Sequence, residues 1–251
     1  NSIDTSYQSD VTLHTDGFAT GVGLVDIVNG VGSLPISDTH AETVHLSLTD
    51  SQSTGLNVSS TQPLTFAAGP VASFSLTDPG DMFAKTRLGY TVTRHDSFGN
   101  SVGTGTTTVY LYSSSTSSTK KFYNDSLAGS SITSIDIGAG HSTANFWYYD
   151  EAPGTYTVTA SDATPTADGA TGIADATDSV VVNPVATKFV IVPATNGTVD
   201  APITVTVQAQ KPDNSVDTNY QSDVTLHTDG SATGAGLVDI INGVGSLNIS
   251  D

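Results

Sequence analysis

The sequence predicts an all-β protein built from tandem β-sandwiches, and three observations lead to that prediction. Residues that favour helices are scarce, because the 251-residue chain contains one Met and two Glu against 69 Ser and Thr. Apolar and polar side chains alternate over short stretches that end at Gly, Pro, Asn or Asp, which is the pattern of half-buried strands. A long internal repeat then indicates that one architectural unit is used more than once.

The repeat joins the two ends of the chain. Residues 1–38 return as residues 214–251, an offset of 213, and 32 of the 38 positions are identical. Five of the six differences keep the size or the turn character of the residue. A duplication this faithful indicates a tandem array with a 213-residue period. We expect both ends to lie within a repeat, so that residues 186–213 would complete the first copy and residues 39–67 the second.

Two similar stretches mark the module boundaries. AAGPVASF (67–74) and VNPVATKF (182–189) each place Pro-Val-Ala before a Ser or Thr and an aromatic residue, as expected of a linker that runs into a first strand. They divide the chain into 1–67, 68–185 and 186–251, and one full module has the size of a single β-sandwich of about 100 residues. Because proline fixes one backbone angle in each linker, we expect short and fairly stiff joints.

The strands follow from the alternation, taken in order. The central module, which we expect to be complete, contains six alternating stretches besides its first strand: 89–96, 106–114, 131–138, 142–150, 154–162 and 178–184. The flanking module is read from both partial copies, and its expected strands are 187–194, 202–210, 222–228, 236–242 and 244–250, closed by 42–50 and 62–69 of the first copy. Seven or eight strands for each module predict a sandwich.

Parts of the chain resemble a known family. HDSFGNSV (95–102) and the stretch SSITSIDIGAGHSTANFWYYDEAPGTYTVTAS (130–161) resemble the bacterial immunoglobulin-like modules found in tandem in invasin- and intimin-type surface proteins. NGVGSLPISDTHAETVHLSL (29–48) is similar to the corresponding half of such a domain, whereas KPDNSV (211–216) departs from the pattern. The resemblance implies tandem immunoglobulin-like sandwiches with an extracellular, array-forming role. It carries over no catalytic or binding residue.

Charge and cysteine content exclude several functions. The chain contains 7 Lys and Arg and 25 Asp and Glu. The resulting formal net charge of -18 would repel nucleic acid and anionic lipid surfaces. Cysteine is absent, which excludes disulfides, thiolate metal sites and a cysteine nucleophile. No apolar run approaches the 18 or more residues of a membrane span. We therefore expect neither nucleic acid nor direct membrane insertion among the partners.

One loop is a candidate calcium site. SDATPTADGATGIADATDSV (161–180) carries Asp162, Asp168, Asp175 and Asp178 in a stretch long enough to fold around a hard cation. The spacing matches neither an EF-hand nor a nonapeptide repeat, and the alternative is a solvated loop in an acidic chain. Calcium is the only cofactor that the sequence suggests.

An aromatic row is a candidate interface. If Ala144, Phe146 and Tyr148 face the core, then Asn145, Trp147 and Tyr149 form an exposed row that could contact a neighbouring module, a subunit or a sugar. The alternative is the reversed register, in which Trp147 belongs to the core. The four glycosylation sequons, at Asn57, Asn124, Asn196 and Asn248, are expected by chance in a chain so rich in Ser and Thr.

Three other patterns indicate no chemistry. His14 and His227 alternate with apolar residues and are expected on the exposed face rather than in a metal site. The S-x-x-K pattern from Ser117 to Lys120 lies in a low-complexity stretch without the helix that a penicillin-recognising site requires. Lys188 alternates outward in its strand, which disfavours a spontaneous crosslink to Asn, because that reaction needs a buried Lys beside an acid.

The sequence therefore predicts a structural, non-catalytic repeat unit of an extracellular or cell-surface stalk or fibre, with neighbouring repeats or identical subunits as head-to-tail partners. One alternative is a self-assembling filament subunit whose chains complete one another by strand donation. Another is a carbohydrate-binding or spacer module of a secreted enzyme. The duplicated 38 residues argue against strand donation, because a dedicated subunit would not need the same strands twice.

Overall fold

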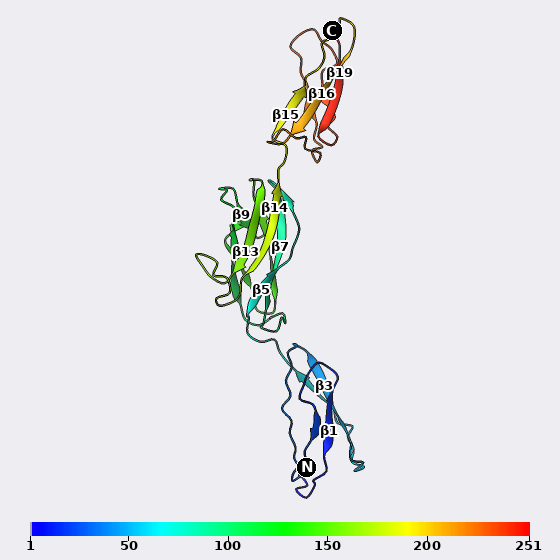
Figure 1. The fold of residues 1–251 in the computed structure, drawn as a ribbon, viewed down its shortest axis with the longest axis vertical. Helices are drawn as coiled ribbons and strands as arrows, with labels where there is room; N and C mark the ends of the chain where they lie inside the picture. Colours follow the sequence, from blue (N-terminus) through cyan, green and yellow to red (C-terminus); the bar gives the residue numbers. More distant parts are fainter. Residues whose placement is uncertain (1) are drawn as a thin grey trace.

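The chain forms three β-units that follow one another end to end. The computed structural model describes residues 2–251, and its two termini lie at opposite ends of an elongated molecule (Figure 1). The predicted all-β class is confirmed, since no helix forms between residues 2 and 251 and the strands assemble into five sheets. Within that range there is consequently no helix long and apolar enough to cross a membrane.

The first unit, residues 2–67, contains a single antiparallel sheet of order β2-β1-β3-β4. Its strands are β1 (Val11–Thr15), β2 (Gly23–Val25), β3 (Thr43–Thr49) and β4 (Gln62–Thr65). Only Ala19, Val25 and Val44 are buried apolar side chains in this unit.

The central unit, residues 68–185, is a sandwich of two five-stranded sheets, with orders β10-β9-β12-β7-β5 and β11-β8-β13-β14-β6. Sixteen buried apolar side chains form one cluster between these sheets. The strands are β5 (Ser73–Leu76), β6 (Met82–Phe83), β7 (Arg87–His95), β8 (Thr107–Ser113), β9 (Lys121–Tyr123), β10 (Ser131–Ile132), β11 (Ser134–Ile137), β12 (Thr143–Tyr149), β13 (Gly154–Ser161) and β14 (Ala176–Asn183).

The third unit, residues 186–251, combines the three-stranded sheet β15-β16-β19 with the two-stranded sheet β17-β18. Five buried apolar side chains make up its core cluster. Its strands are β15 (Lys188–Val192), β16 (Ile203–Gln210), β17 (Val224–Thr225), β18 (Leu237–Val238) and β19 (Val244–Ile249).

Some expected strands differ from the structure. Residues 222–228 and 236–242 were expected to form full strands, but only the two-residue strands β17 and β18 occur there, because no strand like β3 lies beside them. The stretch 131–138, expected as one strand, divides at Thr133 into β10 and β11, which join different sheets. The short strands β6 and β9 were not predicted, since two or three residues carry no measurable alternation.

Candidate functional sites

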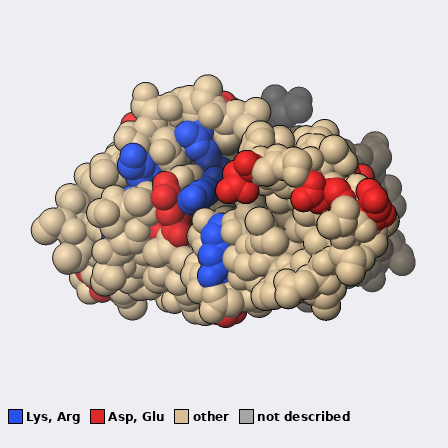
Figure 2. Space-filling view, turned by 90° about the horizontal axis from the view of Figure 1, so that it is seen from above, with Lys and Arg blue, Asp and Glu red and all other residues tan. Residues whose placement is uncertain are grey.

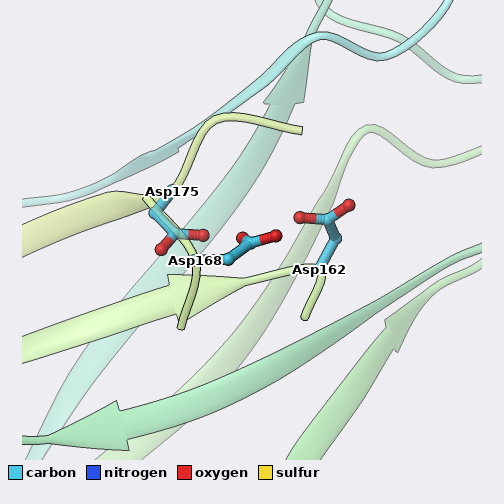
Figure 3. Close-up of side chains that lie close together, drawn as sticks. All are labelled: Asp162, Asp168 and Asp175. Atoms are coloured by element: carbon cyan, nitrogen blue, oxygen red, sulfur yellow. The ribbon is translucent and has the colours of Figure 1, made fainter. Parts of the chain in front are cut away.

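The predicted calcium loop brings three of its four carboxylates together. Asp162 follows the end of β13, and Asp175 directly precedes β14, so the antiparallel pairing of these two strands places both residues at the same end of the sheet. Asp168 reaches them from the loop between the strands, and one carboxylate oxygen of each residue lies within 4.8 Å of the others (Figure 3). Hard cations such as Ca²⁺ take oxygen ligands of this kind.

Two oxygens of this group have no hydrogen-bond partner. Asp162 accepts a hydrogen bond from the backbone N–H of Ile173 (3.2 Å) on Oδ2, and Asp175 accepts one from Gly169 (2.8 Å) on Oδ2. The Oδ1 atoms of Asp162 and Asp175 are shielded from solvent and receive no hydrogen bond from residues 2–251. Buried carboxylate oxygens without a donor are unfavourable, and oxygens placed in this way could hold a cation.

Asp178, the fourth predicted ligand, has a different role. It lies within β14 and accepts a hydrogen bond of 2.9 Å on Oδ2 from the hydroxyl of Tyr90 in β7 of the facing sheet. Burial, and secondarily this hydrogen bond to a carboxylate, raise the pKa of Tyr90 well above its ordinary value. The contact links the two sheets of the central unit and is separate from the three-carboxylate group.

The aromatic row of β12 lies on the outer face of its sheet. Phe146 and Tyr148 are fully buried, which directs Asn145, Trp147 and Tyr149 to the opposite side. The structure thus has the first of the two registers considered above. Trp147 is only partly exposed, because its indole lies over Gly89 of the neighbouring β7, where a Cβ atom would come within 2.9 Å of Nε1.

Arg87 and Tyr123 limit access to this row. The Arg87 guanidinium lies 3.4 Å from the centre of the Tyr123 ring, and Tyr123 packs edge-on against Tyr149 at 6.2 Å. The Tyr149 hydroxyl donates a hydrogen bond to Glu151 (2.7 Å), and this contact, with some burial, raises the pKa of Tyr149 to about 12. The row is therefore a polar and aromatic surface whose rings are held in place by these contacts.

A buried arginine, Arg94, was not predicted from the sequence. Arg94 of β7 is fully buried, and its guanidinium donates to the backbone oxygens of Val102 (2.7 Å), Gly105 (2.9 Å) and His141 (2.8 Å). No carboxylate pairs with it among the described residues, and burial lowers its pKa. The signal was present, because Arg94 alternates with two buried residues of the same strand, Tyr90 and Val92. It ties together two loops, the one between β7 and β8 and the one between β11 and β12, at the end of the central unit that faces the first unit.

The first joint is held by two polar side chains. Asn100 accepts a hydrogen bond from the N–H of Ala41 (3.0 Å) and donates one to the carbonyl of Thr39 (2.8 Å), which connects the central unit to the first. Asp96 accepts hydrogen bonds from the Asn100 side chain (3.0 Å) and from the linker N–H of Gly69 (2.9 Å). The Asn100 side chain is the main cause that lowers the pKa of Asp96 to about 2, and backbone donors add to it.

The second joint has fewer contacts. The linker N–H of Ala186 donates to Asp217 Oδ2 (2.7 Å), and Thr187 donates to the Gln210 carbonyl (2.9 Å). Among residues 2–251, no side chain of the central unit beyond this linker hydrogen-bonds to the third unit. The two joints, expected to be alike from their shared Pro-Val-Ala sequence, therefore differ in their anchoring.

The remaining sequence patterns lie in unremarkable positions. His14 and His227 are both exposed. Lys120 Nζ donates to the carbonyl of Ser113 (3.2 Å), and the described stretch from Ser117 to Lys120 contains no helix. Lys188 is exposed and contacts the side-chain oxygen of Asn214, but the buried setting that a crosslink requires is missing.

Comparisons with known proteins give distant likenesses only. No protein-family model and no curated protein matches this chain. Similar solved structures include FdeC, an Escherichia coli adhesin, with 15% identity over 97% of this chain and 77% of that one, at a TM-score of 0.46. Domains 4–9 of the surface layer protein SbsC share 17% identity over all of this chain and 35% of theirs, at a TM-score of 0.31. A β-glycosidase from Bacteroides vulgatus shares 10% identity over 70% of this chain and 21% of its own, at 0.36. At these scores none of the likenesses assigns a function to this chain.

Proposed function

We propose that this chain is a structural repeat unit of an extracellular or cell-surface stalk or fibre and that it performs no catalysis. The observation that carries the proposal is the 38-residue duplication, with an offset of 213 residues, in a chain whose units follow one another end to end. A repeat of that kind lengthens a molecule each time it is added. Stacking of β-units, rather than chemistry at a cleft, is then the activity.

The surface composition supports a passive, soluble exterior. Charged residues make up 13% of the chain, while 69 of its residues are Ser or Thr. On the face seen along the long axis, most of the surface is neither acidic nor basic, and the basic side chains visible there lie close to acidic ones (Figure 2). A largely neutral hydroxyl coat with a net negative charge resists aggregation of exposed strand edges.

Stretching single molecules tests this function. Pulled from both ends, the central unit should unfold in one discrete event, and its 118 residues then add on the order of 400 Å of chain before its folded length is subtracted. Small-angle scattering should give an elongated particle with the ends far apart. Smooth extension without a discrete event, or a compact particle, would contradict a load-bearing role.

We further propose that the group formed by Asp162, Asp168 and Asp175 binds calcium. Support comes from the convergence of three carboxylates and from the two shielded oxygens that lack a donor. A cation there would join the ends of β13 and β14 and stiffen the loop between them.

Calcium titration of chelator-treated protein tests the loop. Calcium at a hundredfold excess over its dissociation constant should stabilise the central unit by about 2.7 kcal/mol. Asp162→Asn and Asp175→Asn should abolish the binding heat, whereas Asp136→Asn, an exposed carboxylate of the same unit, should leave it unchanged. Equal melting temperatures in calcium and in chelator would show that the loop is only a solvated acidic turn.

A further inference from the structure

The central unit has a cavity at one side of its sandwich. The chain crosses there from one sheet to the other, because β10 pairs with β9 and the next strand, β11, pairs with β8 of the facing sheet. At the crossing the Thr133 carbonyl accepts a hydrogen bond from the N–H of Leu111 (2.9 Å). The cavity has a volume of about 330 Å³ and is lined by residues 111–113, 120–122 and 131–133. All of these lie within the central unit, so the outer units take no part in forming it.

The floor of the cavity is apolar and is held in place by the core. Leu111 and Phe122 are 5% and 7% exposed, and Ile132 packs against the same core cluster. The Phe122 ring lies edge-on to Phe146, with 5.8 Å between the ring centres, and tilted against Tyr148 at 5.4 Å. Because these contacts exist before any ligand arrives, little side-chain freedom remains to be lost on binding.

Two lysines stand at the mouth of the cavity, and both are exposed. Lys120 Nζ donates to the Ser113 carbonyl (3.2 Å) and contacts the carbonyl of Ser115, which holds the ammonium beside β8 with donor capacity to spare. Neither Lys120 nor Lys121 forms an ion pair with a carboxylate within residues 2–251. Their charges are therefore free to pair with an anion from outside.

The lining of the cavity reverses the charge balance of the chain. Asp and Glu outnumber Lys and Arg by 25 to 7 in the sequence, yet the described lining contains two of the seven cations and none of the carboxylates. Ser131 and Thr133, which also line it, add hydroxyl donors. A cationic mouth attracts a negative group, and a buried apolar floor favours a hydrocarbon group. The combination fits a ligand with an anionic head and an apolar tail.

The volume of the cavity limits the size of such a ligand. At about 30 Å³ for each water-sized group, about 330 Å³ holds about ten of them. An octanoate ion has about that number of non-hydrogen atoms. A polysaccharide or a phospholipid is much larger, so the cavity suits a small molecule.

We propose that this cavity, which we call the lysine pocket, binds a small amphipathic carboxylate. The apolar tail lies on Leu111, Phe122 and Ile132, and the carboxylate pairs with Lys120 and Lys121. This binding function goes beyond the structural role proposed above and does not rest on it, so a failure of either proposal leaves the other intact.

Titration of the isotope-labelled full chain with octanoate, followed by NMR up to about 10 mM, tests the pocket. The amide resonances of Leu111, Phe122 and Ile132 should shift together and saturate, while that of Leu226 in the third unit stays in place. Octylammonium has the same tail and the opposite charge, and acetate lacks the tail, so neither should produce a saturating shift. From butyrate to octanoate, each added CH₂ group should tighten binding by up to about fourfold.

Lys120→Met combined with Lys121→Met removes both charges and should weaken octanoate binding at least about tenfold. The matched control is Lys85→Met, which changes an exposed lysine of the same unit outside the cavity lining and should leave the affinity unchanged. Because Lys120 also contacts carbonyls of the chain, the single variant Lys121→Met, with an expected loss of about threefold or more, separates the charge from a local rearrangement.

Three results would overturn the proposal. The first is octanoate that gives no saturating shift of the pocket amides in the parent chain. The second is a Lys120, Lys121 double variant that binds octanoate as tightly as the parent does. The third is octylammonium that binds at the same amides with the affinity of octanoate, because the lysines would then select no charge.

Discussion

The two copies of the duplicated segment share their turns and differ in their strands. Asn29 and Gly30 have φ angles of 54° and 79°, and their counterparts Asn242 and Gly243 have 53° and 78°. In both copies the glycine N–H donates to the carbonyl of the same tyrosine, Tyr7 or Tyr220, at 2.9 Å. Local geometry therefore follows the local sequence, as expected for an Asn-Gly turn with both residues in the left-handed region.

The formation and length of the strands, by contrast, depend on whether a neighbouring strand is present. Residues 11–15 form the full strand β1 beside β3, while the identical residues 224–228 form only β17 (Val224–Thr225). Residues 244–249 form β19 beside β16, while residues 31–36 form none. Because residues 11–15 and 224–228 are identical, the difference between β1 and β17 teaches that pairing across the sheet, rather than intrinsic preference, decides the length of this strand.

Supplying the absent neighbour should have the largest effect. Appending the chain's own residues 39–67 after Asp251 should extend β17 and bury Phe189 and Ile191. Each buried side chain contributes about 1.5–3 kcal/mol, so the third unit gains several kcal/mol. Hydrogen exchange of the Leu226 amide should slow accordingly.

The control for that extension is a scrambled version of residues 39–67. If the Leu226 amide exchanges at the same rate in the chain that carries the authentic extension as in the parent, strand length in the third unit does not depend on a partner strand.

The second prediction uses two corresponding positions of β7 and β16. Arg94 and Ala209 are both fully buried, but only Arg94 binds loop carbonyls. Arg94→Met leaves these acceptors without donors and should destabilise the central unit by about 3 kcal/mol or more. Trp147, the single tryptophan, reports the unfolding of that unit alone.

Ala209→Met provides the comparison, since it alters the third unit and should leave the Trp147 transition in place. If Arg94→Met shifts the transition no further than Ala209→Met does, the arginine is not what holds the loops of the central unit.

The alternation of side chains predicted most strands but not their exact partners. Phe146 and Tyr148 could be placed in the core from their period of two, and the Asp loop was recognisable by composition. Asp178 could not be separated from the other three carboxylates, because its contact with Tyr90 joins residues 88 positions apart. The Asn100 contacts with the first unit span about 60 positions and leave no local pattern. These contacts between distant segments escaped prediction, whereas Arg94 could have been found from its alternation with Tyr90 and Val92.

The third prediction contrasts the two joints as the pH falls. The pKa of Asp96 is lowered to about 2 from about 3.9 in unfolded chains, so its contribution is complete above pH 4 and is lost as the pH falls towards 2. The protection of the Gly69 amide, measured as its exchange rate relative to the intrinsic rate at each pH, should therefore fall across that window. The Thr187 amide of the second joint donates to a backbone carbonyl and should not follow the same titration.

Asn100→Ala should mimic the acid effect at neutral pH, because it removes the largest cause of the lowered pKa of Asp96 and both contacts to the first unit. The pH dependence of the Gly69 amide should then move upward. If the pH dependence of exchange at the Gly69 amide is identical in the parent and the variant, Asp96 does not stabilise the first joint.

The last prediction has the smallest expected effect. It tests whether the missing neighbouring strand or Pro35 causes the difference between the two copies. Pro35 stands where the second copy has Asn248, and proline disfavours strand pairing, so it offers a rival explanation for the absence of a strand at 31–37. If the missing partner is the cause, Pro35→Asn should create no strand and should change stability by less than about 0.5 kcal/mol. Exchange of the amides at 31–37 measures this directly: protection that rises to the level of β19 would assign the difference to proline, whereas unchanged protection leaves the absent neighbour as its cause.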